Sequence, residues 1–140
     1  PMRDVRVVVH DGKHHSVDSK EIAFVMAGRK AFIAAVREAR PIVLEPIVRV
    51  EIAAPEANVG DITGDLTARR GLISGTRSSE PGMLSIQGQA PLSELAGYQS
   101  RLNAMTGGQG RYTIEFSHYE AVPPAVQQQL VGQYRVREEE

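Results

Sequence analysis

Residues 60–71 read Gly-Asp-Ile-Thr-Gly-Asp-Leu-Thr-Ala-Arg-Arg-Gly, and their spacing predicts a helix with a defined buried face. Val59, Ile62 and Leu66 recur at i, i+3 and i+7, which places them on one apolar side. Gly60 and Gly64 lie four residues apart on a neighbouring side. Glycine lowers helix stability, but it lets another backbone come close.

Charge and glycine mark the end of this helix. Asp65 lies one turn before Arg69, which predicts an ion pair between them. Arg69 and Arg70 fall in the last turn, where positive charge suits the helix dipole, and Gly71 can take a left-handed cap. One arginine is enough to pair with Asp65, so we expect Arg70 to be free to bind phosphate. The alternative is a well-capped surface helix with no ligand.

Strands flank this helix on both sides. Alternation of apolar and polar residues predicts strands over residues 47–52, 72–73, 84–90 and 112–117. A second helix, with Pro91 at its first position, carries apolar residues at helical spacing, namely Leu92, Leu95, Tyr98, Leu102 and Met105. The order βαββαβ is the ferredoxin-like plan, an α+β fold with two helices on one face of an antiparallel sheet.

The first 43 residues do not fit this plan. Alternating valines predict a strand from Val5 to His10, and Asp18 or Ser19 is expected to cap a long helix that Pro41 ends. One strand and one helix cannot enclose a core. We therefore expect a strand–long helix piece of a larger α/β domain whose beginning lies outside the chain.

Three segments follow from these patterns. Residues 1–43 are the end of the larger domain, and residues 44–120 are the ferredoxin-like domain. Residues 121–140 form a C-terminal helix, with Val122, Val126 and Leu130 at helical spacing, and an acidic tail.

Composition excludes several classes of protein. There is no Cys, so disulfides, thiolate zinc sites and cysteine nucleophiles are excluded. No apolar run approaches the roughly 20 residues of a membrane span, and the start is unlike a signal peptide, so we expect a cytoplasmic protein without a membrane partner. The net charge of −1 argues against a general nucleic-acid binder, and no DNA partner is expected. Residues 1–40 nevertheless hold eight Lys/Arg against five Asp/Glu, which indicates a local anion-binding surface.

Several short motifs occur in one order along the chain. They are Val17–Phe24, Leu44-Glu45-Pro46-Ile47, Gly60–Leu66, Ala68-Arg69-Arg70-Gly71, Pro91–Leu95, Gly97-Tyr98 and Tyr112–Tyr119. This ordered series resembles the C-terminal part of bacterial translation elongation factor G, from about Val5 to about Leu130.

The resemblance implies that residues 1–43 are the C-terminal portion of the family's fourth domain, and residues 44–120 its fifth. The partner it implies is the ribosome: the fourth domain reaches the decoding region and follows the tRNA–mRNA duplex during translocation, and the fifth lies near large-subunit RNA. GTP and Mg would belong to an N-terminal GTPase domain. This chain has no Gly-x-x-x-x-Gly-Lys-[Ser/Thr] loop, so no catalytic residue, cofactor or metal is expected in it.

The family's tip loop matches Asp11–His15, with His15 at the tip position. Gly12, Lys13, His14 and His15 are therefore the expected RNA contacts of the N-terminal piece, since a cation and two imidazoles can attract phosphate, donate hydrogen bonds and stack on bases. Arg69 and Arg70 are the expected RNA contacts of the fifth domain.

Two other interpretations of the tip loop stay open. One is a solvated polar turn without a ligand, since loops are generally polar. The other is a metal site built from His10, His14, His15 and Asp18, although this spacing fits no standard zinc pattern.

Three further motifs suggest chemistry that their context does not favour. Gly107-Gly108-Gln109 spells the tripeptide of peptide release factors, but here it joins a helix to a strand, where glycines turn the chain. His118 is expected to alternate inward with Tyr112, Ile114 and Phe116 as a core or edge histidine. Asp61 and Asp65 are expected to be solvated helix acids, not an acid–base pair.

Departures from the family pattern indicate a divergent paralogue. Members usually carry an aromatic residue at the position of His14, Phe at Ala96, and Gln-Gly-Arg-Gly near Gly107–Gly110. A second possibility for the function is a small-molecule-binding regulatory module, because a ferredoxin-like fold does not by itself decide function.

Overall fold

The computed structural model describes residues 1–17 and 20–138. The chain divides into two compact units, residues 1–41 and residues 42–140, and each is described by itself. None of the described helices is long and apolar enough to cross a membrane.

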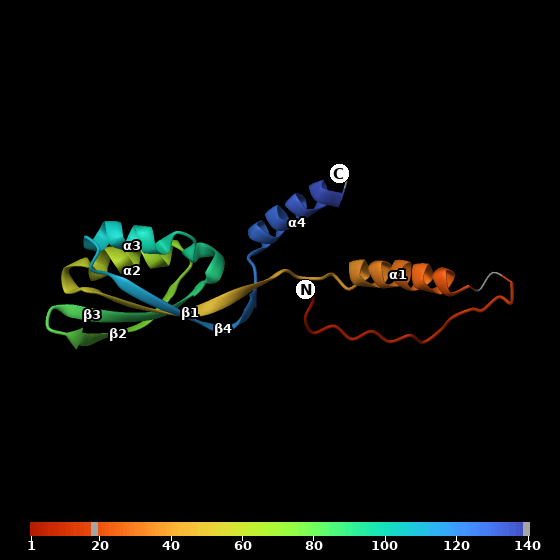
Figure 1. Ribbon diagram of the computed structural model, residues 1–140, viewed down its shortest axis with the longest axis horizontal. Helices are drawn as coiled ribbons and strands as arrows, with labels where there is room; N and C mark the ends of the chain where they lie inside the picture. Colours follow the sequence, from red (N-terminus) through yellow and green to blue (C-terminus); the bar gives the residue numbers. More distant parts are fainter. Residues whose placement is uncertain (18–19, 139–140) are drawn as a thin grey trace. The chain divides into compact units, whose positions relative to one another are not determined.

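The second unit is an α+β domain with the predicted ferredoxin-like order. Its elements are β1 (Leu44–Pro55), η1 (Glu56–Asn58), α2 (Val59–Ala68), β2 (Leu72–Glu80), β3 (Met83–Pro91), η2 (Leu92–Leu95), α3 (Tyr98–Thr106), β4 (Arg111–Ala121) and α4 (Pro124–Glu138). The four strands form one antiparallel sheet in the order β2-β3-β1-β4. Helices α2 and α3 cover one face of this sheet (Figure 1).

The core lies between these helices and the central strand β1. The side chains of Val48, Val50, Ile52 and Ala54 alternate along β1 and are buried, as the period of two in a strand requires. From the helices, Ile62, Leu66, Tyr98 and Leu102 are fully buried in the same cluster. The predicted apolar face of residues 59–66 is confirmed. Burial of each such aliphatic side chain contributes about 1.5–3 kcal/mol.

The end of α2 differs from the prediction in one residue. The residue with positive φ is Arg70 (φ 60°), not Gly71. Gly71 is required for a different reason: a Cβ atom there would lie 2.6 Å from Cγ of Leu66. The glycine therefore allows the chain to pass close to the buried helix, while the preceding arginine makes the turn.

The second predicted helix is divided in the structure. Pro91 is the last residue of β3 and pairs with Ile47, so it does not begin a helix. The short 3₁₀ turn η2 follows, and Gly97 (φ 69°) then redirects the chain into α3. The apolar spacing from Leu92 to Met105 is continuous, but the left-handed glycine interrupts the helix.

The inward placement predicted for two residues of the edge strand β4 was wrong. Ile114 and Phe116 lie opposite Val50 and Val48, yet 45% and 53% of their surfaces are exposed. In the sheet order, β4 is an edge strand, so its side chains need not be covered as those of the central strand are. Helix α4 follows this strand, and the side-chain carbonyl of Gln127 accepts a hydrogen bond from the Val43 amide at 3.3 Å.

The first unit contains α1 (Glu21–Glu38) and an irregular segment. The prediction of a strand from Val5 to His10 was wrong: these residues form no strand, and no ladder partner exists for them among the described residues of the chain. A strand is stabilised by pairing of its backbone groups, which the alternating valines cannot supply by themselves. Lys20 occupies the N-cap position of α1 without a side-chain capping hydrogen bond, and the expected caps Asp18 and Ser19 lie outside the described residues.

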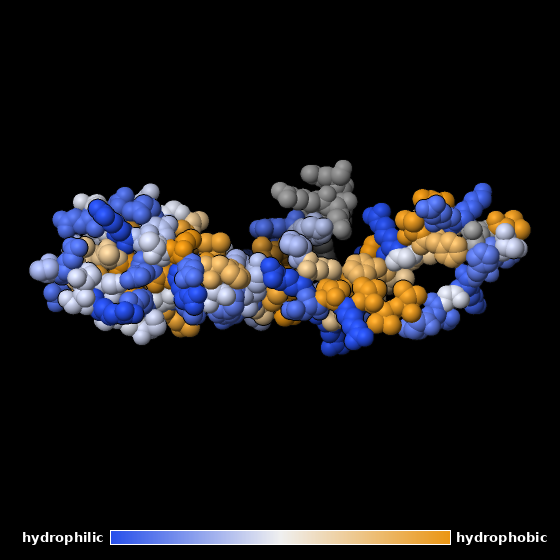
Figure 2. All heavy atoms as spheres, turned by 60° about the horizontal axis from the view of Figure 1, so that its bottom comes forward, coloured by the Kyte–Doolittle hydropathy of each residue, from blue (hydrophilic) through white to orange (hydrophobic). Residues whose placement is uncertain are grey.

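Helix α1 exposes its apolar side. None of its residues is buried, and Ile22, Val25 and Met26 are more than half exposed. Figure 2 shows apolar side chains, in orange, on the surface of this unit. The described residues of this unit therefore form no hydrophobic core of their own.

Candidate nucleic-acid interface

The tip loop precedes α1 in the first unit. The Asp11 carboxylate accepts a hydrogen bond from the Gly12 amide at 2.8 Å. The His14 ring stacks on Phe24 of α1, with ring centroids 6.1 Å apart and 12° between the planes. Nδ1 of His15 accepts a hydrogen bond from the Val17 amide at 3.2 Å, so in the neutral ring the proton is on Nε2.

These contacts divide the tip residues by role. His14 is held against the helix, whereas the Lys13 side chain is exposed and forms no ion pair in the described part of the chain. Lys13 can therefore present a positive charge to a partner, and RNA contact by the tip residues stays a prediction. The four predicted tip residues follow one another in an irregular segment, and the turn lies at Ser16 and Val17.

The second predicted contact lies at the end of α2, and its main feature is that Arg70 is already paired. Its two terminal nitrogens donate to the two carboxylate oxygens of Glu45 at 2.7 and 2.9 Å, and Nε donates to Glu94 at 3.2 Å. Glu45 is only 8% exposed. The hydrogen bonds that Arg70 donates to Glu45 raise the pKa of Arg70 above its usual range, against the opposing effect of burial. The expectation that Arg70 is free was wrong.

Arg69 is also engaged. Its Nε donates to the Asp65 carboxylate at 3.0 Å, which confirms the predicted i,i+4 ion pair, and its Nη1 donates to the backbone carbonyl of Glu94 at 2.6 Å. Its guanidinium carbon lies 5.3 Å from the centre of the Tyr98 ring, a cation–π distance. RNA contact by Arg69 and Arg70 stays a prediction, with fewer available donors than the sequence suggested.

A third arginine completes this region and was missed from the sequence. Arg101 of α3 donates from Nε to the second oxygen of Asp65 at 3.3 Å. Sequence reasoning identified Asp65 and Arg69 because they are four residues apart. It could not find Arg101 or Glu45, which lie 36 and 25 residues from their partners.

The other motifs have structural explanations. Gly107 and Gly108 have φ values of 60° and 84°, and the amides of Gly108 and Gln109 close the end of α3 on Asn103 and Thr106. The His118 ring lies between the hydroxyl of Ser117 and the carboxylate of Glu120. These observations place the tripeptide in a helix-ending turn and the histidine on an edge strand.

Acid–base and metal chemistry find no support among the described residues. The expectation that Asp65 is a solvated acid was wrong, because its side chain is only 14% exposed and both of its oxygens accept from guanidinium groups. No three His, Asp or Glu residues in the described ranges are grouped so that they could hold a metal ion. Asp18, which the metal interpretation includes, lies outside those ranges.

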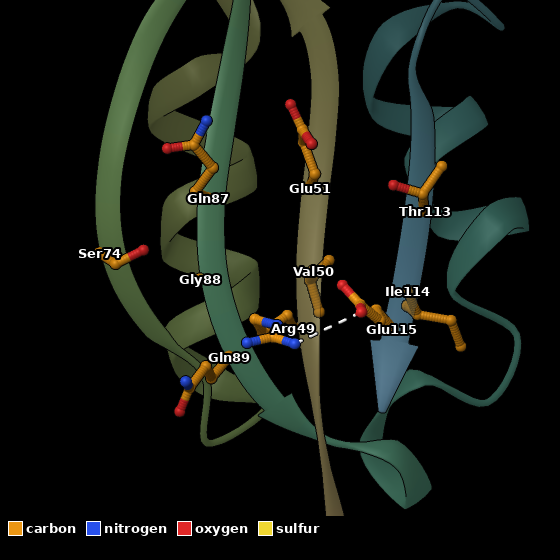
Figure 3. Close-up of a pocket in the computed structure, with 10 residues that line it drawn as sticks. All are labelled: Arg49, Val50, Glu51, Ser74, Gln87, Gly88, Gln89, Thr113, Ile114 and Glu115. Atoms are coloured by element: carbon orange, nitrogen blue, oxygen red, sulfur yellow. Dashed lines mark ion pairs between the residues drawn. The ribbon is translucent and has the colours of Figure 1, made fainter. Parts of the chain in front are cut away.

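The uncovered face of the sheet carries a shallow depression of about 360 Å³ (Figure 3). Its polar lining comes from β1, β2, β3 and β4 and includes Arg49, Glu51, Gln87, Gln89, Thr113 and Glu115. Arg49 and Glu115 are 3.4 Å apart. No aromatic side chain lines this depression, so it lacks the stacking platform that sheet-based RNA binding uses.

A second hollow, of about 760 Å³, lies between the end of β4 and α4. Its lining residues are Ile42, Ala121, Val122, Pro124, Gln127, Gln128, Val131 and Gly132, and none of them is ionisable. The second hollow has no charged lining residue, and in the first the Arg49 and Glu115 side chains already pair with each other. The arginine cluster, formed by Arg69, Arg70 and Arg101, and the tip loop are therefore the parts of the surface best suited to bind an anionic partner.

Comparison with known proteins identifies the family of both units. Residues 1–40 match the family model described as elongation factor G, domain IV, and residues 42–130 match that described as elongation factor G C-terminus. An elongation factor G-like protein from Thermotoga maritima is 40% identical over 96% of the chain, and elongation factor G 2 from Saccharophagus degradans is 41% identical over 100%. A solved structure from Thermus thermophilus covers 91% of the chain with 42% identity and a TM-score of 0.73.

The matches differ from this chain in length. The chain spans 20% of each of these two relatives and 19% of the solved chain. The two family models together account for nearly all residues up to 130. On this evidence, the chain belongs to the elongation factor G family and carries sequence of its domain IV and of its C-terminal domain.

Proposed function

We propose that the chain is the ribosome-contacting C-terminal part of a translational GTPase that promotes tRNA–mRNA translocation. The observation that carries the proposal is the match to elongation factor G domain models over both structural units. GTP and Mg would be bound by an N-terminal domain outside this chain. Within the chain, the work is done by binding energy and not by bond chemistry.

The tip loop supports this role through its available charge. Lys13 is exposed and can form a charge-assisted hydrogen bond to an RNA phosphate. The stacking of His14 on Phe24 ties the loop to α1. A displacement of the loop on RNA binding would therefore be transmitted to α1 through this stacking contact.

A test separates this mechanical role from GTP hydrolysis. In the full-length GTPase, Lys13→Gln with His15→Gln is expected to slow single-turnover translocation about tenfold, which corresponds to about 1.4 kcal/mol of transition-state stabilisation. Ribosome-stimulated GTP hydrolysis should stay unchanged, because the substituted groups do not contact the nucleotide. Lys30→Gln on the exposed surface of α1 is the matched control and should change neither rate.

Equal loss of both activities in the double variant would contradict this division of labour. The regulatory-module alternative is distinguished by salt. Binding to ribosomal RNA weakens steeply as salt rises, because phosphate contacts release counterions. Binding of an uncharged effector in one of the hollows would not.

A further inference from the structure

The three arginines on the helical side of the second unit differ in the donors they have left. Arg70 uses three nitrogens on Glu45 and Glu94, and its side chain is 31% exposed. Arg69 uses two nitrogens, lies over the Tyr98 ring and is 23% exposed. Arg101 uses only Nε and is 55% exposed. Its terminal fork has no acceptor among the residues that the structure describes.

Asp65 holds this fork in place. Its carboxylate is only 14% exposed and accepts from Arg69 on one oxygen and from Arg101 on the other. Asp65, Arg69 and Arg101 together carry one net positive charge, which Arg70 with Glu45 and Glu94 balances, so the exposed fork of Arg101 and not the net charge is the feature that suits an anion. Because the Nε contact restricts the side chain, the two terminal nitrogens of Arg101 stay available as the planar pair of donors that matches two phosphate oxygens.

The two helices beside Arg101 differ in charge, since α2 carries Asp61 one turn before Asp65 and α3 carries no acid. Helix α3, Tyr98–Thr106, contains no Asp or Glu that could compete for Arg101 within the helix. On α2, Gly64 directly precedes Asp65, and a Cβ atom there would meet nothing within 4 Å. Packing inside this unit does not require that glycine, and its absent side chain leaves the helix backbone accessible.

From these contacts we infer that Arg101 is the phosphate-binding residue of the C-terminal domain, with Asp65 as its positioning residue, and that its partner is an RNA backbone. The inference rests on the proposed ribosome contact and makes it specific. The inference also changes the role of Arg70, which becomes a structural ion-pair residue that joins α2 to β1 and η2. The RNA contact that the sequence predicted for Arg70 is assigned to Arg101.

The test measures binding of the 140-residue chain to purified large ribosomal subunits between about 50 and 300 mM KCl. Arg101→Gln should weaken binding about fivefold at the lowest salt and reduce the slope of log K against log[salt] by about 0.7–1, as loss of one phosphate contact predicts. Arg77→Gln removes the same charge from an exposed position on β2 and should leave both quantities unchanged. Arg101→Lys should keep the slope and lose affinity, because the charge stays while the fork is lost.

Asp65→Asn tests positioning separately from net charge. Simple electrostatics predicts tighter binding after removal of an acid, whereas loss of the Nε contact predicts weaker binding at an unchanged or steeper salt slope. Tighter binding would overturn the positioning role. Thermal unfolding of each variant verifies that the fold is retained.

Two outcomes separate failure of this inference from failure of the proposed function. If the wild type binds with a steep salt slope and Arg101→Gln matches it, the Arg101 assignment is wrong and the ribosome contact stands. If the wild-type chain does not bind the subunits even at the lowest salt, the ribosome contact proposed for this chain fails, and the Arg101 assignment fails with it.

Discussion

Tyr98→Phe is expected to preserve or increase stability at neutral pH and to increase it clearly at alkaline pH. The Tyr98 side chain is fully buried, meets the Tyr112 ring edge-on at 5.1 Å and lies beneath Arg69. Its hydroxyl has no hydrogen-bond partner in the part of the chain that the structure describes. Phenylalanine keeps both ring contacts and removes an unpaired polar group, whose burial costs about 1–3 kcal/mol.

The alkaline effect follows from the pKa of this hydroxyl. Burial raises the pKa of Tyr98 to about 12, with a smaller contribution from Asp65 and an opposing one from Arg69. The unfolded value is 10.0, so the folded state binds this proton more tightly. The associated stability is complete below about pH 10 and is lost as the pH rises through about 12. Linkage gives a loss of about 1.4 kcal/mol by about pH 11, which the Phe variant avoids.

Urea unfolding followed by circular dichroism at about pH 7, 9, 10 and 11 measures both effects. The difference in unfolding free energy between the variant and the wild type should grow by about 1.4 kcal/mol between about pH 9 and pH 11. Tyr134→Phe, at a position that is 66% exposed on α4, is the control and should follow the wild type. A constant difference across this range, or a Phe variant less stable by more than about 1 kcal/mol at neutral pH, would refute the reasoning.

Three further substitutions test the end of α2, each by urea unfolding at neutral pH. Gly64→Ala should stabilise the chain by about 0.5–1 kcal/mol, because the site is helical and open; a loss would mean that an unseen contact fills this space. Gly71→Ala should destabilise it by about 1–3 kcal/mol, because the new Cβ would lie 2.6 Å from Leu66; a neutral result would contradict that crowding. Arg70→Gln should destabilise the chain by about 2–4 kcal/mol, because Glu45 is left buried without its partner. The additional change Glu45→Gln should recover part of this loss, and no recovery would argue against a direct pair.

Periodicity predicted the elements of the second unit because burial itself is periodic. Ile62 and Leu66 recur at helical spacing since one side of α2 faces the sheet, and the β1 residues alternate for the same reason. The predictions failed where the backbone conformation of a single residue sets the direction of the chain. The left-handed turn at Arg70 and the break at Gly97 depend on single φ values that an apolar pattern does not encode.

The candidate site was predictable only where its contacts are local. The Asp65–Arg69 pair follows from spacing within one helix, but the contacts of Arg70 and Arg101 join separate elements of the fold. A left-handed residue other than Gly or Asn is costly, by about 1–2 kcal/mol, so sequence reasoning assigned the turn to Gly71. The bidentate contact with Glu45 can offset that cost, and it is visible only once β1 lies beside the end of α2.

The failed strand at Val5–His10 illustrates a different limit. Alternating valines are compatible with a strand, but a strand forms only where a neighbour accepts its hydrogen bonds. The described residues of the first unit supply no such neighbour, and the apolar side of α1 is exposed in the same unit. A pattern in one segment therefore predicts what the segment can do with a partner, and the tertiary structure decides whether it does so.

The two proposed RNA contacts should differ in what they contribute to affinity. Arg101 is already oriented by a carboxylate that is itself largely buried, so little side-chain freedom is lost on binding. Lys13 is exposed on a loop and must give up rotamer freedom worth about 1–2 kcal/mol, which offsets most of a single phosphate contact. In the 140-residue chain, Lys13→Gln should therefore change ribosome affinity less than about twofold, against about fivefold for Arg101→Gln. The reverse order would show that orientation by Asp65 does not govern binding, and that the exposed tip supplies affinity as well as a contact during translocation.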